Sequence, residues 1–215
     1  PTRRSSDLGL STLAVSYLSI SNGFEKESAL SLQTYKKVID ANIDQLKQRY
    51  TGLAQSQSLR PSVIESITNQ DQVKLQKIGR ELIDNGQTEF IVFTDNQGKV
   101  IARGHDTKYG DNIDNQYCVK QALSGEQCVT FEAGKVVKIS LRASVPVKEN
   151  GKIIGAVLVG MNITGSNKFV DNIKSLMDVE ATIFIGNTRE STTLAADGRR
   201  LVGTKLDYKE ILTTV

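Results

Sequence analysis

The feature that most constrains the fold is a change in the spacing of apolar residues near residue 86. Over residues 24–58, apolar side chains recur every three or four residues, as on one face of a helix: Leu32, Tyr35, Ile39, Ile43, Leu46, Tyr50 and Leu53. Beyond Gly86, apolar and polar residues alternate, as in strands. The spacing predicts a helix of more than about 40 Å, followed by a sheet in an α+β domain.

Two shorter helices are expected between the long helix and the sheet. Pro61 suits the first position of a helix, and a further helix over residues 70–84 ends at Asn85-Gly86. Strands are predicted at residues 89–94, 99–105, 128–132, 137–147 and 152–163, with a short helix at 116–123. The pair Asn150-Gly151 indicates a hairpin. Because the last strand is apolar on both faces, we expect it near the centre of a five-stranded antiparallel sheet.

The chain after residue 165 partly repeats this order. A helix at 166–177 leads to strands that begin at 181 and to a glycine loop at Gly203, much as Gly110 follows the earlier pair of strands. We interpret residues 166–215 as a linking helix and the start of a second, truncated module. The alternative is a C-terminal extension that packs on the first sheet.

The first residues call for a separate interpretation. Residues 1–8 match the in-frame translation of a common sequencing adapter and are interpreted as an assembly scar. The apolar run at 9–20 is too short to span a bilayer, so we interpret residues 9–23 as the end of a transmembrane helix. An amphipathic first turn of a soluble helix is the alternative. Residues 24–165 then form the first module, and the chain is expected to be a fragment of a longer protein.

Composition excludes some classes of function. The net charge of +3 comes from scattered rather than clustered cations, so no nucleic-acid partner is expected. The two cysteines, Cys118 and Cys128, are too few for a zinc site. They either close a small loop as a disulfide or remain two partly buried free thiols.

The strand at residues 137–147 carries the candidate site. Alternation places Val137, Ile139, Leu141, Ala143, Val145 and Val147 on one side, which should pack on the long helix. The other side presents cations and hydroxyls: Lys138, Ser140, Arg142 and Ser144. Arg103 and His105 share a face of the strand at residues 99–105. Because guanidinium groups bind carboxylates bidentately, we expect these cations to converge on a small carboxylate or similar anion. The alternative is a solvated strand face.

No catalytic or cofactor motif is present. The chain lacks the motifs of serine hydrolases, zinc proteases and P-loop enzymes, and no cofactor is expected. Asp106, Asp111 and Asp114 do not have the spacing of a calcium loop and are expected to be solvated loop and cap residues. The sequence therefore favours a binding domain over an enzyme.

Three runs resemble the Cache sensor domains of methyl-accepting chemotaxis proteins: ARGHDTKYGDNIDNQ, VKQALSG and VVKISLRASVPVKENGKIIGAVLVGMNI. The resemblance covers residues 24–165, and ATIFIGNTRESTTLAADGRRLVGTKL resembles the opening of a second Cache module. SLRASVPV also resembles a strand of citrate and C4-dicarboxylate sensor kinases. In those kinases an arginine at the position of Arg142 binds the ligand carboxylate, and Arg103 falls near a ligand-binding histidine. Ser144 stands where a second cation is usual, so citrate itself is not implied.

The resemblance implies a PAS-like α+β sensor in the periplasm, anchored in the bacterial inner membrane and paired as a homodimer through the long helix. It would bind a small organic anion and signal across the membrane. The same sensor attached to a histidine kinase or a diguanylate cyclase is the first alternative. A soluble enzyme with an unrecognised active site, dependent on His105 or a carboxylate pair, is the second.

Overall fold

The computed structural model describes residues 25–134 and 137–206, with side chains from residue 32 onward. The chain forms two compact units, one of residues 37–162 and one that contains the chain from Ile163 onward and the residues before Lys37. Within the described ranges, no helix is long and apolar enough to cross a membrane. The interpretations of residues 1–8 and 9–23 lie outside the described residues.

Three helices precede the sheet, as predicted: α1 (Glu25–Ser58), α2 (Pro61–Thr68) and α3 (Gln72–Asp84). Pro61 opens α2, where its missing N–H costs nothing because the first turn of a helix has no internal acceptor. The carboxylate of Asp71 caps α3 by accepting the backbone N–H of Lys74 at 3.0 Å. These local rules explain why the boundaries of the helices were predictable.

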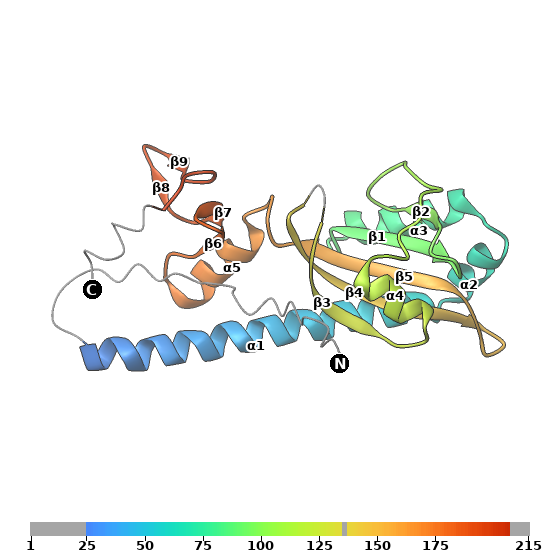
Figure 1. Ribbon diagram of the computed structural model, residues 1–215, viewed down its shortest axis with the longest axis horizontal. Helices are drawn as coiled ribbons and strands as arrows, with labels where there is room; N and C mark the ends of the chain where they lie inside the picture. Colours follow the sequence, from blue (N-terminus) through green and yellow to red (C-terminus); the bar gives the residue numbers. More distant parts are fainter. Residues whose placement is uncertain (1–24, 135–136, 207–215) are drawn as a thin grey trace, which may run out of the picture. The chain divides into compact units, whose positions relative to one another are not determined.

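The sheet has five strands: β1 (Phe90–Asp95), β2 (Val100–Arg103), β3 (Cys128–Ala133), β4 (Ile139–Glu149) and β5 (Lys152–Asn162). Their order is β2-β1-β5-β4-β3, and every neighbouring pair is antiparallel (Figure 1). The five-stranded antiparallel sheet with β5 at its centre is therefore confirmed. The strand predicted from residue 137 begins at Ile139, because its pairing with β3 ends at Ala133 opposite Ile139.

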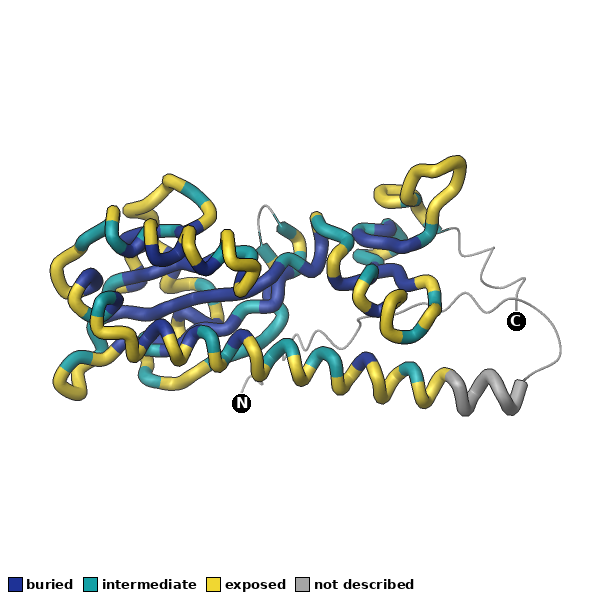
Figure 2. The backbone as a smooth tube through the Cα atoms, turned by 180° about the vertical axis from the view of Figure 1, so that it is seen from behind, coloured by how far each residue is buried: buried dark blue, intermediate teal, exposed yellow. Residues whose placement is uncertain are grey.

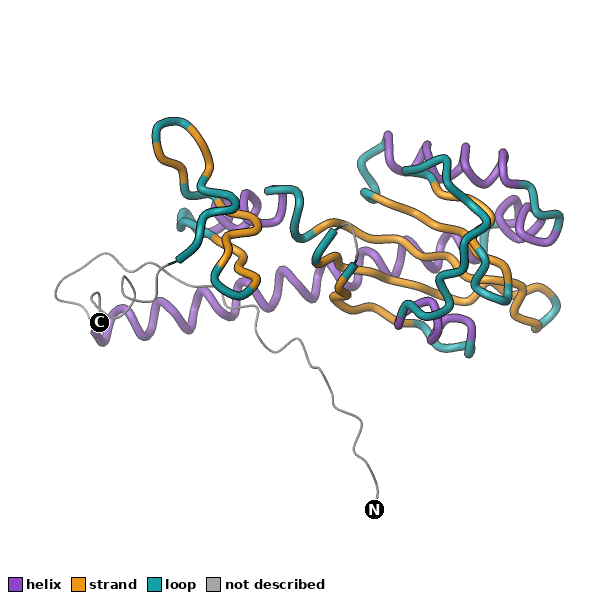
Figure 3. Tube along the Cα trace, turned by 45° about the horizontal axis from the view of Figure 1, so that its top comes forward, coloured by secondary structure: helices purple, strands orange, loops and turns teal. Residues whose placement is uncertain are grey.

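The two faces of the sheet have different covers. Leu141, Ala143, Val145 and Val147 are buried on one face, where α3 packs on β1 and β2, and α2 on β5. The part of α1 from Lys37 onward runs along this same face, as seen from behind in Figure 2. The short helix α4 (Tyr117–Leu123) covers the opposite face, and Figure 3 shows it with α1 on the far side of the strands. The apolar side of β4 thus faces the long helix, as expected.

A small apolar cluster holds α4 on its face of the sheet: Val92, Val100, Ile113, Val119 and Leu158. Each of these side chains is buried, so the cluster excludes water from this half of the face. The polar residues of β3 and β4 occupy the other half, next to the first turn of α4.

The second unit holds a helix and two hairpins. The helix α5 (Lys168–Met177) is followed by β6 (Thr182–Ile185) and β7 (Thr188–Thr192), which pair antiparallel. A second hairpin joins β8 (Ala195–Ala196) to β9 (Arg199–Arg200). The hydroxyl of Ser191 donates to the carbonyl of Ser166 at 2.9 Å and ties β7 to the segment before α5.

Candidate ligand-binding site

The polar residues of β4 lie on the face covered by α4. Strand pairing sets Ser140 opposite Glu132, Arg142 opposite Thr130 and Ser144 opposite Cys128. Because directly opposed residues share a face of the sheet, β3 and β4 together present these side chains toward α4. The predicted polar face is therefore a covered surface and not a solvated one.

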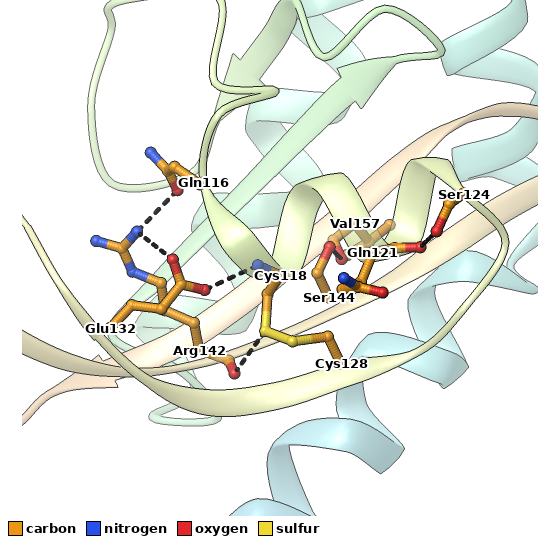
Figure 4. Close-up of a disulfide and its surroundings, with 9 residues drawn as sticks. All are labelled: Gln116, Cys118, Gln121, Ser124, Cys128, Glu132, Arg142, Ser144 and Val157. Carbon is orange, nitrogen blue, oxygen red and sulfur yellow. Dashed lines mark hydrogen bonds and ion pairs between the residues drawn. A yellow bond between two sulfur atoms is a disulfide. The ribbon is translucent and has the colours of Figure 1, made fainter. Parts of the chain in front are cut away.

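Arg142 is held at the centre of this surface. Its Nε donates to Ser140 Oγ at 2.9 Å. Its Nη1 donates to Gln116 Oε1 at 2.8 Å, as drawn in Figure 4. Nη1 also lies 3.5 Å from Glu132 Oε2, and the two side chains are only 13% and 10% exposed. Burial lowers the pKa of Arg142 and the nearby Glu132 opposes the shift, yet a guanidinium remains protonated in proteins. The surface thus holds a buried, oriented cation.

Glu132 fixes α4 to the sheet from the side of β3. Its Oε1 accepts the backbone N–H of Cys118, in the first turn of α4, at 3.0 Å. A disulfide also joins Cys118 to Cys128 of β3, and Figure 4 shows both links beside Arg142. Of the two states open to the cysteines, the structure has the bonded one.

Lys138 and Ser144 have roles outside this cluster. Lys138 precedes β4 and is exposed, and its carbonyl accepts the N–H of Gly134 at 3.3 Å. Ser144 is fully buried, and its hydroxyl donates to the carbonyl of Val157 at 3.1 Å. The Ser144 hydroxyl is therefore used within the sheet itself.

Arg103 also points to the face covered by α4, since it lies opposite Val92. Its Nη1 and Nη2 donate to the two carboxylate oxygens of Asp111 at 2.7 and 2.8 Å, and Nη1 donates to the carbonyl of Lys108 at 2.8 Å. The hydrogen bond from Arg103 holds the pKa of the Asp111 carboxyl below its usual range. Asp111, expected to be a solvated loop residue, is 54% exposed and is also the partner of Arg103.

His105 lies beyond the end of β2, with its ring 5.9 Å from that of Phe90 in an edge-to-face arrangement. The residue is exposed in part, yet burial of the rest, followed by the charge of Arg103, lowers the pKa of its imidazole. Neutral imidazole is thereby favoured at this position.

The expected convergence of the cations is wrong as a single cluster. Strands β1 and β5 lie between β2, which carries Arg103, and β4, which carries Arg142. At roughly 4.8 Å per strand, about 14 Å separates the two backbones. The structure therefore divides the predicted residues into an Arg142 cluster and an Arg103 cluster.

Two residues of the Arg142 cluster, Gln116 and Glu132, were missed by sequence reasoning. A signal for Glu132 was present, because it has the same parity as Cys128 and Thr130 in β3 and so shares their face. Gln116 precedes α4 without a recognisable pattern.

A separate surface depression contains none of the predicted residues and is lined by Asp114, Asn115, Lys120, Leu123 and Ser124. Among the described residues, no group of three metal-ligating side chains is present.

The fold agrees with a known class of sensory domains. Residues 25–215 match the dCache_3 family, described as the double sensory domain of two-component sensor kinases. The chain belongs to this family, so it is a sensory domain and the Cache resemblance is confirmed. Among curated proteins, none matches the chain in sequence.

Solved structures with the same fold include sensors of two kinds. The sensor domain of the Vibrio cholerae histidine kinase DctB is 13% identical with a TM-score of 0.59, over 87% of this chain and 73% of that one. The sensor domain of Escherichia coli DcuS is 21% identical, with a TM-score of 0.52 over 63% of this chain and 96% of that one. The ligand-binding domain of the Campylobacter jejuni chemoreceptor Tlp3, solved with 4-methylisoleucine, is 16% identical with a TM-score of 0.55, over 87% and 75% of the two chains. These matches confirm the α+β Cache fold with its long first helix.

Proposed function

We propose that this sensory domain binds a small carboxylate-bearing molecule at Arg142, between the sheet and α4, as the extracytoplasmic part of a membrane receptor. The observation that carries the proposal is the set of hydrogen-bond partners of the Arg142 guanidinium. Its Nε donates to Ser140 and its Nη1 to Gln116, with Glu132 Oε2 3.5 Å from Nη1, whereas Nη2 has no acceptor among the described residues. Nη2 is not one of the buried atoms without a partner among the described residues, so it reaches solvent. An incoming carboxylate oxygen is therefore a favourable, charge-assisted acceptor for Nη2.

Arg103 does not compete for this role. Both of its terminal nitrogens already bind the carboxylate of Asp111. A ligand would have to displace an ideal bidentate partner there, so the anion site is assigned to Arg142 alone. His105, next to the Arg103 cluster, is assigned no contact with the ligand carboxylate.

Signal transfer would use the opposite face of the sheet. Residues of β4 alternate between the Arg142 cluster and the apolar face that packs on the helices. A ligand that prefers one packing of the sheet against α1 would favour that state by its differential affinity. We propose that α1 pairs two copies of the chain and transmits a small shift or rotation across the membrane. Residues 24–165 and 166–215 would be the first module and the start of the second.

The receptor's output is proposed to be that of a chemoreceptor. The description of the matched family favours a second candidate, a histidine kinase, and both kinds occur among the structures with this fold. The coding sequence beyond Val215 distinguishes them: a methylated signalling helix supports the chemoreceptor, and a dimerisation and phosphotransfer domain supports the kinase.

A thermal-shift screen tests the proposed ligand class. The chain is heated with amino acids, dicarboxylates, tricarboxylates, amines and purines, and a ligand at a hundred times its Kd should add roughly 2.7 kcal/mol to the free energy of unfolding. Arg142→Lys keeps the charge beside Glu132 but loses the bidentate geometry of the guanidinium, so the response to carboxylates should fall to roughly half or less. Lys148→Ala, an exposed cation on the same strand, is the matched control.

An Arg142→Lys variant that folds and responds like the unmodified chain contradicts the proposal. Chemical turnover of any bound compound that depends on His105 would instead support the alternative of a soluble enzyme.

A further inference from the structure

We propose that Glu132 determines the class of ligand: its carboxylate pairs with the cationic group of a zwitterion whose carboxylate binds Arg142. The inference rests on the proposed function of Arg142. It names the ligand as a small molecule with both a carboxylate and a protonated amine, in preference to a dicarboxylate or a tricarboxylate.

The first step is that the two charges are oriented separately. Glu132 Oε1 is held by the backbone N–H of Cys118 at 3.0 Å. Arg142 is held by Ser140 at 2.9 Å and by Gln116 at 2.8 Å. Each charged group therefore has a neutral partner that fixes its direction without the other charge.

The second step is the distance between the two charged groups. Glu132 Oε2 lies 3.5 Å from Arg142 Nη1, which is longer than the roughly 2.7–2.9 Å of a fully formed charge-assisted hydrogen bond. By contrast, Arg103 and Asp111 approach to 2.7 and 2.8 Å at both oxygens. Glu132 Oε2 and Arg142 Nη2 thus keep capacity for a ligand, with a negative and a positive group side by side.

The third step is the net charge of the surface. Glu132 and Arg142 are 10% and 13% exposed, so an unbalanced charge beside them is poorly solvated. A ligand with only negative groups would add negative charge next to Glu132 and leave it uncompensated. A zwitterion adds no net charge and satisfies both groups. The pair therefore discriminates against purely anionic ligands.

The neighbouring strand supplies an apolar surface for the remainder of such a ligand. Gly160 of β5 lies between Arg142 and Phe90 in one row across the sheet. A Cβ on Gly160 would lie 2.5 Å from the Phe90 ring, so the ring leans over the glycine toward the row of Arg142. An apolar substituent next to the charged groups would contact this ring.

The test compares the unmodified chain with Glu132→Gln by isothermal titration. The probes are the common L-amino acids, the same carbon skeleton without its amino group for each amino acid that binds, and succinate and citrate. We expect at least one amino acid to bind the unmodified chain at least tenfold more tightly than its deaminated counterpart, succinate or citrate. In Glu132→Gln, that preference should fall at least tenfold, because the deaminated acid binds more tightly and the amino acid more weakly.

Glu126→Gln, which changes an exposed carboxylate near the same helix, should leave every affinity unchanged. Glu132→Asp keeps the charge and should retain the preference for the amino acid at lower affinity. If Glu132→Gln does not fold, the inference is overturned when Glu132→Asp binds the amino acid as tightly as the unmodified chain does.

Three results would overturn the inference: no amino acid binds, succinate or citrate binds the unmodified chain most tightly, or the preference is the same in both Glu132 variants and the unmodified chain. Loss of carboxylate binding in Arg142→Lys alongside an unchanged preference in Glu132→Gln removes this inference and leaves the proposed function standing. Carboxylate binding that is insensitive to Arg142→Lys removes the proposed function itself.

Discussion

Arg103 and Arg142 project from the same face of one sheet, yet they meet different partners. Arg103, on β2, forms a bidentate pair with Asp111, whose side chain is 54% exposed. Arg142, on β4, is held by Ser140 and Gln116 and lies beside a buried carboxylate at a longer distance. An arginine that is fully paired with its own chain closes a loop, whereas one that is oriented but incompletely paired is suited to bind a ligand.

The largest effect on stability should come from separating the buried pair. Arg142→Met should lower the free energy of unfolding by about 3 kcal/mol, because it leaves the Glu132 carboxylate buried without its cation. Adding Glu132→Gln to the same chain should recover most of this loss. Urea unfolding measures both variants, with Lys148→Met as the exposed control. A double variant as unstable as Arg142→Met alone would show that the two charges are not coupled.

Removal of the disulfide should have the next largest effect on stability. It should disturb the Arg142 cluster and leave the Arg103 cluster unchanged. The bond between Cys118 and Cys128 closes a loop of sequence separation 10, which corresponds to about 2.7 kcal/mol in the chain-entropy account. The double variant Cys118→Ala/Cys128→Ala should lose this amount and no longer respond to reductant. It should also bind ligand more weakly, since the bond holds α4 on β3, and the backbone N–H of residue 118 in α4 orients Glu132. An unmodified chain whose melting temperature is unchanged after full reduction would contradict this prediction.

The Arg103 cluster should give a smaller effect with no change in ligand binding. Asp111→Asn should cost about 1 kcal/mol or less, because the carboxylate is largely exposed and the pair is screened by solvent. Since Arg103 lowers the pKa of Asp111 in the folded chain, this stabilisation is complete above roughly pH 4 and is lost as the pH falls through the lowered value. Melting curves from pH 7 to pH 3 should converge for the two chains. A reduced ligand response in Asp111→Asn would contradict the assignment of ligand binding to the Arg142 cluster alone.

His105 should produce the smallest effect. Burial, then Arg103 and more weakly Arg80, lower its pKa, while Asp106 and a hydrogen bond to the backbone of Ile91 oppose the shift. The folded chain therefore holds fewer protons than the unfolded chain, and stability should decline slightly as the pH falls below about 6.5. His105→Asn should remove this dependence. Melting temperatures of both chains between pH 8 and pH 5 test this prediction. An equal dependence on pH in both chains would contradict the lowered pKa of His105.

Much of the fold could be predicted from local patterns. The stripe on α1, the proline at the start of α2 and the Asn150-Gly151 turn each depend on neighbours a few residues away, so sequence alone specified them. Asn150 and Gly151 indeed adopt φ values of +50° and +77°, as a tight hairpin turn requires.

The candidate site was less predictable because it depends on strand order and register. The alternation in β4 correctly placed Ser140 and Arg142 on one face. The sequence indicated a central β5 but not which strands flank it, and its place between β1 and β4 moves Arg103 away from Arg142. The partnership of Glu132 with Arg142 likewise requires the β3–β4 register. Pairing between strands that are distant in the sequence produces no periodic pattern of residues.

The most direct test of this account is calorimetric titration of the tightest-binding carboxylate from the screen into three chains: the unmodified one, Arg142→Lys and Arg103→Lys. Both variants keep a cation and lose only the fork of the guanidinium. The account predicts at least tenfold weaker binding in Arg142→Lys, about 1.4 kcal/mol, and an affinity within twofold of the unmodified chain in Arg103→Lys. Weaker binding in Arg103→Lys with full affinity in Arg142→Lys would contradict it.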